Sequence, residues 1–273
     1  MEYLQVNIPC GNEEQKEITI ALLENAGYEG FEEKEDSVAA YINKDQFNKE
    51  ELEGILAPMA LGFTTEIIAQ QNWNSAWESN FEPVIIEEFC TIRASFHDLR
   101  VTTPYEIVIT PKMSFGTGHH ATTLQIVQQM AGMDFIGKRV LDFGTGTGIL
   151  AILAEMLGAT EILAIDNDGW AYENTKENIG ANNCRKVEVQ QGSLELAGEG
   201  YDIILANINR HILLEYMNDM YNKTKTCGHV LMSGLLREDR DIVEKAAAKA
   251  GFQLGNYSEH NNWISLLFKK MGI

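Results

Sequence analysis

VLDFGTGTG, at residues 140–148, has the pattern of a buried strand, a glycine-rich turn and the start of a helix. Gly144, Gly146 and Gly148 carry no Cβ, so the turn can adopt backbone angles that other residues resist and can approach a ligand closely. Asp142 lies at the carboxyl end of the strand, which is where open α/β sheets bind their ligands. The stretch predicts a cofactor site on a mostly parallel sheet.

The residues around this turn indicate which cofactor it binds. A dinucleotide turn, G-x-G-x-x-G/A, needs a small residue at position 149, where this chain has Ile149. The spacing D-x-G-x-G-x-G instead resembles the first motif of class I methyltransferases, whose cofactor is S-adenosylmethionine. The next strand, residues 161–166, ends in Asp166, and a carboxylate there can accept both ribose hydroxyls. The glycine turn alone would also fit an ordinary tight connection, but the terminal Asp166 favours a cofactor site.

The composition is that of a globular protein. At 273 residues, 45% of them hydrophobic and 22% charged, the chain can form one large domain and a smaller one. No apolar run approaches the roughly 18 residues of a membrane span, and the first residues lack the pattern of a secretory signal. The four cysteines are scattered, which favours reduced thiols over a disulfide framework or a zinc site. We therefore expect a cytoplasmic protein.

The chain is strongly acidic, with a formal net charge of −19. Such a surface repels phosphate backbones, so we expect no direct nucleic-acid substrate and an attraction to a basic partner. Acidity also promotes solubility, and that simpler interpretation stays open. Residues 1–70 hold fifteen Asp and Glu against four Lys and no Arg, so much of the charge lies at the front of the chain.

The front of the chain has the pattern of a small α+β domain. Strand and helix patterns alternate through residues 3–69 in the order β-α-β-β-α-β, with a hairpin around Asp36 and Ser37. That order is typical of a ferredoxin-like module, which we place at residues 1–70. A binding face for a basic protein and a plain solvated surface fit its acidic residues equally well.

Residues 71–100 are interpreted as a linker helix and the start of a hairpin. Trp73, Trp77 and Phe81 recur at four-residue spacing, which puts their rings on one helical face, packed between linker and domain. Two strand patterns, CTIRASF and YEIVIT, follow and predict a hairpin that leads into the second domain, residues 101–273.

The segment KMSFGTGHHATT, residues 112–123, lies between that hairpin and the cofactor strand. Its small polar residues favour a cover over the cofactor. A threonine at its end is expected to cap the helix that begins there, at Thr122 or Thr123. His119 and His120 are adjacent and so point in different directions, which disfavours a shared metal ion, and we expect no metal site.

From residue 138 onward, strand and helix patterns alternate, which predicts a mostly parallel sheet of seven strands with helices on both faces. The last two strands are joined by only two residues, Asn261 and Asn262, and a parallel crossover cannot be that short. The last strand is therefore expected to run antiparallel, as in methyltransferase sheets and unlike dinucleotide-binding ones.

Asn207 ends the fourth strand of this sheet, in the sequence ILANIN. The carboxyl ends of neighbouring parallel strands line one edge, so Asn207 should border the same crevice as Gly144 and Asp166. Its amide oxygen could accept a hydrogen bond from an amine. Methyltransferases that act on nucleobase amines usually have prolines after this residue. This chain has Ile208 and Asn209, which counts against a base as substrate.

Together these motifs resemble the PrmA family, the bacterial methyltransferases of ribosomal protein L11, over nearly the whole chain. The resemblance implies a class I methyltransferase domain, an α/β fold of Rossmann-like type, behind a ferredoxin-like domain that recognises the substrate. It implies that S-adenosylmethionine is the cofactor and that lysine side-chain and N-terminal amines of protein L11 are methylated. The positions that match the family's cofactor site, with Gly146 and the covering segment, are Thr123, Gly144, Gly146, Asp166, Asn207, Phe115, Thr117, Gly118 and His120.

Asn207 is the one catalytic residue that we predict, as the acceptor of a hydrogen bond from the substrate amine. The two histidines are expected to take no part in proton transfer. Three alternatives remain: a methyltransferase of another basic protein or of a small amine, an oxidoreductase, and a non-catalytic module with a decayed cofactor site. Ile149 and the terminal hairpin disfavour the second, and the intact Gly144, Asp166 and Asn207 disfavour the third.

Overall fold

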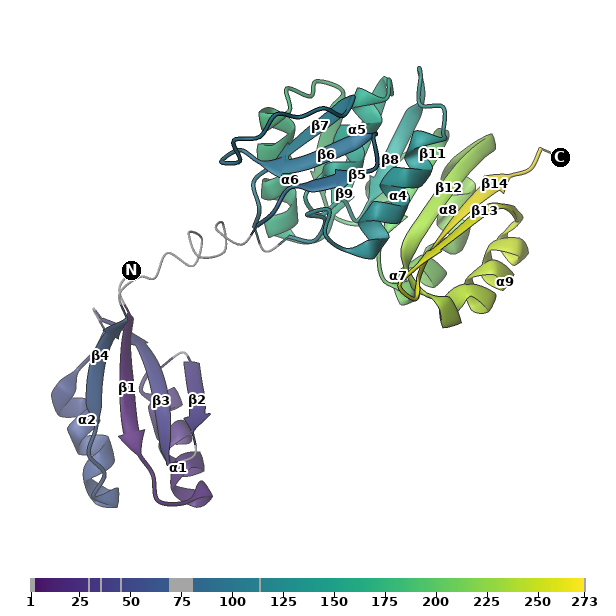
Figure 1. The fold of residues 1–273 in the computed structure, drawn as a ribbon. Coiled ribbons are helices and arrows are strands. Elements are labelled where there is room, and N and C mark those ends of the chain that lie inside the picture. Colours follow the sequence, from purple (N-terminus) through teal and green to yellow (C-terminus); the bar gives the residue numbers. More distant parts are fainter. Residues whose placement is uncertain are drawn as a thin grey trace. The chain divides into compact units, whose positions relative to one another are not determined.

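A computed structural model of the chain describes residues 3–28, 30–34, 36–44, 46–68, 81–112 and 114–272. It divides into two compact units, Met1–Asn80 and Phe81–Ile273, which are described separately (Figure 1). The helix expected around Trp73 and Trp77 lies outside the described residues. Among the described helices, none is both long and apolar enough to cross a membrane.

The described residues of the first unit form a four-stranded antiparallel sheet with two α-helices, and the predicted order β-α-β-β-α-β is confirmed. Its sheet order is β2-β3-β1-β4. Alternate residues of β1, including Val6 and Ile8, are buried because successive strand residues point to opposite faces. The elements are β1 (Tyr3–Pro9), α1 (Glu13–Asn25), β2 (Gly30–Lys34), β3 (Ser37–Asn43), α2 (Lys49–Leu56) and β4 (Thr64–Ile68).

The second unit is built on a seven-stranded sheet with the order β10-β9-β8-β11-β12-β14-β13. The five strands from β10 to β12 are parallel, and β14 pairs antiparallel with both β12 and β13, which confirms the predicted reversed last strand. The strands are β8 (Arg139–Phe143), β9 (Glu161–Asp166), β10 (Val187–Gln191), β11 (Tyr201–Asn207), β12 (Thr224–Leu236), β13 (Phe252–His260) and β14 (Trp263–Lys270).

Helices cover both faces of this sheet (Figure 1). Val140 packs into one core and its neighbour Leu141 into the other, because the parallel strands are buried on both sides. The first core includes α4 (Ala121–Ala131) and α5 (Ile149–Met156), with α6 (Gly169–Ala181) against it, and the second includes α7 (Arg210–Glu215), α8 (Met217–Lys223) and α9 (Arg240–Ala250). The separate helix α8 was not predicted from the sequence.

A small three-stranded sheet precedes α4 and corrects one prediction. It consists of β5 (Val84–Ile86), β6 (Cys90–Ala94) and β7 (Tyr105–Ile109). β6 and β7 pair in parallel, so the hairpin expected between them is wrong; the antiparallel partner of β6 is β5. The connection at residues 95–104 is long enough to return the chain to the same end of the sheet, whereas a hairpin turn would reverse its direction.

Side chains of α6 and of Asn182, the residue that caps its C-terminus, form hydrogen bonds with the backbone at the outer edge of β7. Asn182 exchanges two hydrogen bonds with the backbone of Val108, over 2.8 and 2.6 Å, in the manner of a neighbouring strand. The Thr110 N–H donates to Asn178 and the Thr110 carbonyl accepts from Asn174. These amides fix the position of β7, and therefore of the segment that follows it, relative to α6.

Candidate active site

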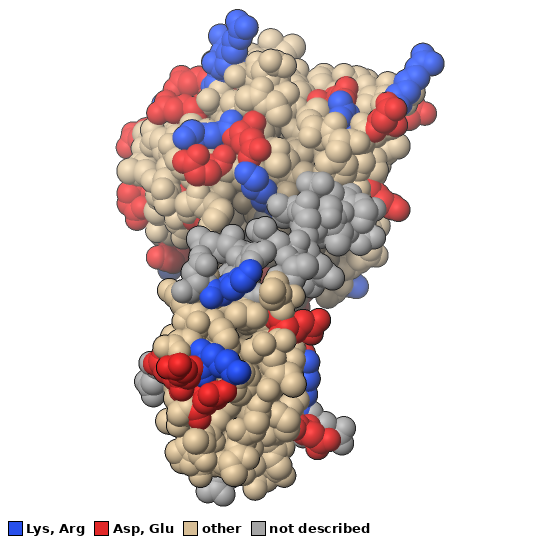
Figure 2. Space-filling model, turned by 90° about the vertical axis from the view of Figure 1, so that its left-hand side faces the viewer, with Lys and Arg blue, Asp and Glu red and all other residues tan. Residues whose placement is uncertain are grey.

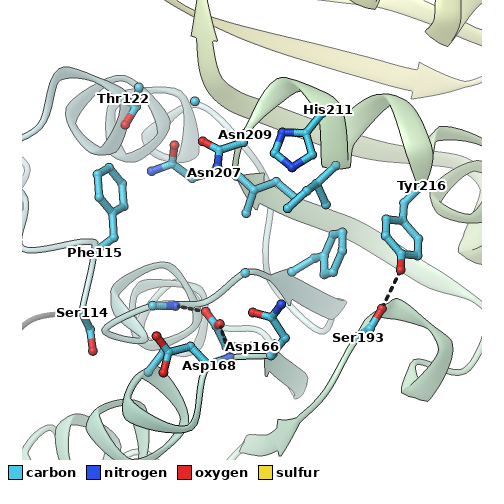
Figure 3. Close-up of a pocket in the computed structure, with 18 of the residues that line it drawn as sticks. Ser114, Phe115, Thr122, Asp166, Asp168, Ser193, Asn207, Asn209, His211 and Tyr216 are labelled. Carbon is cyan, nitrogen blue, oxygen red and sulfur yellow. Dashed lines mark hydrogen bonds between the residues drawn. The ribbon is translucent and has the colours of Figure 1, made fainter. Parts of the chain in front are cut away.

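A pocket of about 770 Å³ in the second unit lies where the parallel strands end at their carboxyl edge. Figure 3 shows Asn207 and Asp166 on opposite sides of it, with Phe115 at one end and Tyr216 at the other. Six of the nine residues expected at the cofactor line this pocket: Phe115, His120, Gly144, Gly146, Asp166 and Asn207.

The glycine turn has the left-handed backbone that its sequence predicts, with φ of 76° at Gly144 and 59° at Gly146. Protein atoms fill the space beside both residues. A Cβ on Gly144 would lie 2.1 Å from the Ile208 side chain, and one on Gly146 would lie 2.3 Å from the Phe115 carbonyl oxygen. Glycine is required here because two other segments of the chain pack directly against the turn.

Asp142 lies beneath the glycine turn and is fully buried. Its Oδ2 accepts hydrogen bonds from the Thr145 hydroxyl, over 2.6 Å, and from the Ala151 N–H. Burial raises the pKa of this carboxyl to about 7, the two hydrogen bonds oppose the rise, and the charge of Asp166 adds to it. Asp142 therefore ties the turn to the first turn of α5.

Asp166 ends β9 and faces the pocket, as predicted. Its Oδ2 accepts from the Gly146 N–H over 2.9 Å, and its Oδ1 accepts from the Asp168 N–H over 3.0 Å. Each carboxylate oxygen can accept more than one hydrogen bond, so both remain able to accept ribose hydroxyls. The backbone contacts hold the carboxylate in one orientation beside the glycine turn.

Asn207 ends β11 on the other side of the pocket. Its Nδ2 donates to Thr123 Oγ1, 3.4 Å away, whereas its Oδ1 is buried and has no hydrogen-bond partner in the described part of the chain. A buried amide oxygen without a partner is costly unless a ligand or water completes it. Thr123 does not line the pocket; it lies behind Asn207 and orients it.

The segment 114–120, named here the cover loop, forms one wall of the pocket with Phe115 and His120. The His120 ring contacts Phe115 and Trp263 edge to face, with centroid distances of 5.2 and 4.6 Å. Trp263 begins β14, so this wall is formed by residues from the beginning and from the end of the second unit's sequence. Thr117 and Gly118 do not line the pocket: Thr117 lies 3.2 Å from His119 Nδ1, and Gly118 packs against Ile92.

The cap of α4 is a histidine, which corrects the expected threonine. His120 Nδ1 accepts from the Thr122 N–H, and both threonines are buried within the first turn of α4. Imidazole can accept a backbone N–H as a threonine hydroxyl does. His119 turns away from His120 and packs on Phe81, with its Nε2 3.0 Å from the Glu82 carbonyl oxygen.

Several lining residues were not predicted from the sequence. Ser114 has a buried hydroxyl without a hydrogen-bond partner in the ranges that the structure describes, and the Ser193 hydroxyl lies 2.9 Å from that of Tyr216. In the sequence, the only signals for a site role are that Ser114 precedes Phe115 and that Ser193 closely follows β10. The lining residues with polar or aromatic side chains that were not predicted as site residues are Ser114, Thr122, Phe143, Asn167, Asp168, Ser193, Asn209, His211, Glu215, Tyr216 and Trp263.

These groups suit S-adenosylmethionine. The carboxylate of Asp166 could accept ribose hydroxyls, the side-chain oxygen of Asn207 could accept from an amine, and Phe143 and Tyr216, with ring centroids 5.4 Å apart, could offer apolar surface for a base. In the described ranges no group of three potential metal ligands is present. The polar and aromatic residues among the pocket lining supply hydrogen-bonding groups and ring surfaces.

The chain also resembles known proteins over most of its length. It matches the family model for ribosomal protein L11 methyltransferase (PrmA) over residues 5–271. It is 38% identical to the ribosomal protein L11 methyltransferase of Phocaeicola vulgatus, over 98% of this chain and 99% of that protein. It is 40% identical to the enzyme of that name from Porphyromonas gingivalis, over 91% and 88% respectively.

A solved structure supports the same relationship. The crystal structure of ribosomal protein L11 methylase from Lactobacillus delbrueckii subsp. bulgaricus is similar with a TM-score of 0.65 and 26% sequence identity. The similarity covers 70% of this chain and 99% of that one. Since the family model and the curated relatives match nearly the whole chain, and the solved structure matches 70% of it, the chain belongs to the ribosomal protein L11 methyltransferase (PrmA) family, whose cofactor is S-adenosylmethionine.

Proposed function

We propose that this chain transfers methyl groups from S-adenosylmethionine to lysine side-chain and N-terminal amines of ribosomal protein L11. Family membership supports the substrate. One observation carries the assignment of the site: Asn207 lines the pocket, and its buried Oδ1 lacks a hydrogen-bond partner among the described residues. An acceptor in that position suits an N–H donor, either the substrate amine or the cofactor's ammonium group.

The chemistry requires a neutral amine aligned with an activated methyl group. When bound, S-adenosylmethionine supplies a methyl group on a positively charged sulfur. A lysine amine has a reference pKa of about 10.4, so the site must favour its deprotonated form. Removal of the amine from water beside a cation lowers its pKa. Asn207 would then accept one N–H of the neutral amine and direct its lone pair toward the methyl group, which is catalysis by positioning.

The first unit is proposed to recognise the substrate, with residues 1–70 as the recognition domain, 71–100 as the linker and 101–273 as the catalytic domain. Its excess of carboxylates would attract a basic protein and repel nucleic acid. Figure 2 shows carboxylates beside basic groups at the edges of this unit's visible face, around a broad area without charged side chains. Attraction would then come from the summed charge of the unit. A cytoplasmic location is part of the same proposal.

The test is transfer of labelled methyl groups from S-adenosylmethionine to purified ribosomal protein L11, by the full chain and by a chain without residues 1–80. The full chain should methylate the protein, and the truncated chain should lose that activity yet bind S-adenosylmethionine, measured by calorimetry. Retained binding would show that the truncated chain is folded. Because attraction between opposite charges is screened by salt, the KM for protein L11 should rise with ionic strength.

Other outcomes separate the alternatives. Methylation of other basic proteins or of small amines at equal rates would keep the methyltransferase and remove protein L11 as its specific substrate. Absence of S-adenosylmethionine binding by the full chain would favour a module with a decayed cofactor site. Undiminished methylation of protein L11 by the truncated chain would contradict the role given to the first unit.

A further inference from the structure

Thr147 is the point at which the glycine turn contacts the cover loop. The side chain is fully buried. The Thr147 N–H donates to the Phe115 carbonyl over 3.0 Å, and the Thr147 hydroxyl donates to the Gly116 carbonyl over 2.7 Å. Thus one residue satisfies two consecutive carbonyls of a segment more than thirty positions earlier in the chain.

Glycines on both sides make this approach possible. A Cβ on Gly146 would lie 2.3 Å from the Phe115 carbonyl oxygen, and a Cβ on Gly116 would lie 2.8 Å from Thr147 Oγ1. Gly116 has a φ of 105°, a backbone conformation that residues with a side chain rarely adopt. The two segments therefore touch through their backbones, with the Thr147 hydroxyl as the side-chain donor between them.

Helix α6 holds the other side of the glycine turn. Asn178 Nδ2 donates to the Thr147 carbonyl and Thr175 Oγ1 donates to the Gly146 carbonyl, each over 2.8 Å. These hydrogen bonds hold the glycine turn against α6, and the Thr147 hydroxyl in turn holds the cover loop against the glycine turn. The Phe115 side chain is 52% exposed and borders the pocket, so its position depends on the backbone contacts on each side of it.

We propose that Thr147 is a positioning residue whose hydroxyl holds the cover loop against the glycine turn and so sets the affinity for S-adenosylmethionine. The proposal rests on the proposed function only for the identity of the cofactor. Without the hydroxyl, the buried Gly116 carbonyl loses its donor, and the cover loop leaves the position that places Phe115 and His120 in the pocket wall. The residue acts through the cover loop and makes no chemical step itself.

The test compares Thr147→Val, which keeps the shape and removes the donor, with Thr147→Ser, which keeps the donor. Loss of a hydrogen bond to a buried carbonyl should raise the Kd for S-adenosylmethionine about tenfold in Thr147→Val. The KM for the cofactor should rise while kcat at saturation changes little, and Thr147→Ser should behave as the parent protein. Without cofactor, hydrogen exchange of the backbone amides of residues 115–118 should be faster in Thr147→Val only.

Thr91→Val is the matched control. Thr91 is a buried threonine of β6 whose hydroxyl lies 2.8 Å from that of Thr103, outside the pocket. Its replacement should lower the melting temperature and leave the Kd unchanged. Gly116→Ala approaches the same contact from the cover loop and should also weaken binding, because its methyl group would crowd Thr147 Oγ1.

Two results would overturn the proposal: parental affinity in folded Thr147→Val, or an equal loss in Thr147→Ser, which would assign the effect to packing of the methyl group. Unfolding of both Thr147→Val and Gly116→Ala would make the contact a stability feature and contradict the positioning role. Since binding is measured without protein L11, a parent protein that binds the cofactor but methylates nothing would contradict the proposed substrate alone.

Discussion

Asn207 and Thr123 are joined by a 3.4 Å hydrogen bond from the amide nitrogen of one to the hydroxyl oxygen of the other, across 84 positions of sequence. The bond links the end of β11 to the first turn of α4. It orients the side-chain amide of Asn207, a residue that lines the pocket and whose buried Oδ1 has no hydrogen-bond partner in the described part of the chain. The most informative substitutions are therefore at these two residues.

Asn207→Ala should lower kcat roughly 10- to 100-fold, the effect of losing one hydrogen bond in a desolvated site, and should change the Kd for S-adenosylmethionine much less. Thr123→Val, which releases the amide, should lower kcat to a smaller extent, and Thr123→Ser should retain the parental rate. Steady-state kinetics and calorimetry check these values. A parental kcat in Asn207→Ala would remove this residue from the mechanism.

Gly144→Ala should abolish cofactor binding and destabilise the second unit by about 2 kcal/mol or more, because its Cβ would lie 2.1 Å from the Ile208 side chain at a φ of 76°. Gly180→Ala in α6 is the control: apart from its chain neighbours and the backbone of its own helix, nothing lies within 4 Å of the added Cβ, so the substitution should stabilise the helix by about 0.5–1 kcal/mol. Urea unfolding and calorimetry measure both. Equal behaviour of the two variants would contradict the packing argument.

Asp142 should give the second unit a pH-dependent stability. Burial raises the pKa of this carboxyl to about 7 in the folded state, whereas an unfolded Asp has a pKa of about 3.9. The folded protein therefore binds the proton more tightly, and the contribution of Asp142 to the free energy of unfolding falls as pH rises from about 4 to about 7. Asp142→Asn should remove this slope.

The measurement is urea unfolding of the cofactor-free protein at several pH values between 4 and 8, for the parent and for Asp142→Asn. The amide of the variant can still accept from the Thr145 hydroxyl, so the comparison isolates the ionisation. A constant difference in free energy of unfolding over the whole range would show that Asp142 titrates normally.

Asn182→Ala should destabilise the second unit by about 2 kcal/mol, since it leaves both the N–H and the carbonyl of Val108 without partners at the edge of β7. Asn222→Ala, at an exposed position of α8, should change the free energy of unfolding by less than about 0.5 kcal/mol. Thermal and urea unfolding compare the two. An effect at Asn182 no larger than that at Asn222 would show that water replaces the lost amide.

The pairing of β6 and β7 shows where sequence patterns stop being informative. Residue spacing predicted both strands, but not their relative direction, because a ten-residue connection permits either pairing. The cap of α4 is a similar case. A threonine that precedes a helix is a good N-cap. Here both threonines are buried inside the first turn of α4, and His120 occupies the N-cap position.

The sequence by itself determined the strand and helix order, the glycine turn, the carboxylate at Asp166 and the reversed last strand, because each depends on residues that are close in the chain. Only the tertiary structure decided the contacts of Thr147 with the cover loop, of Asn207 with Thr123 and of His120 with Trp263. These pairs are far apart in sequence. These residues come into contact because helices and strands pack together in three dimensions. The spacing of residues along the chain does not specify that packing.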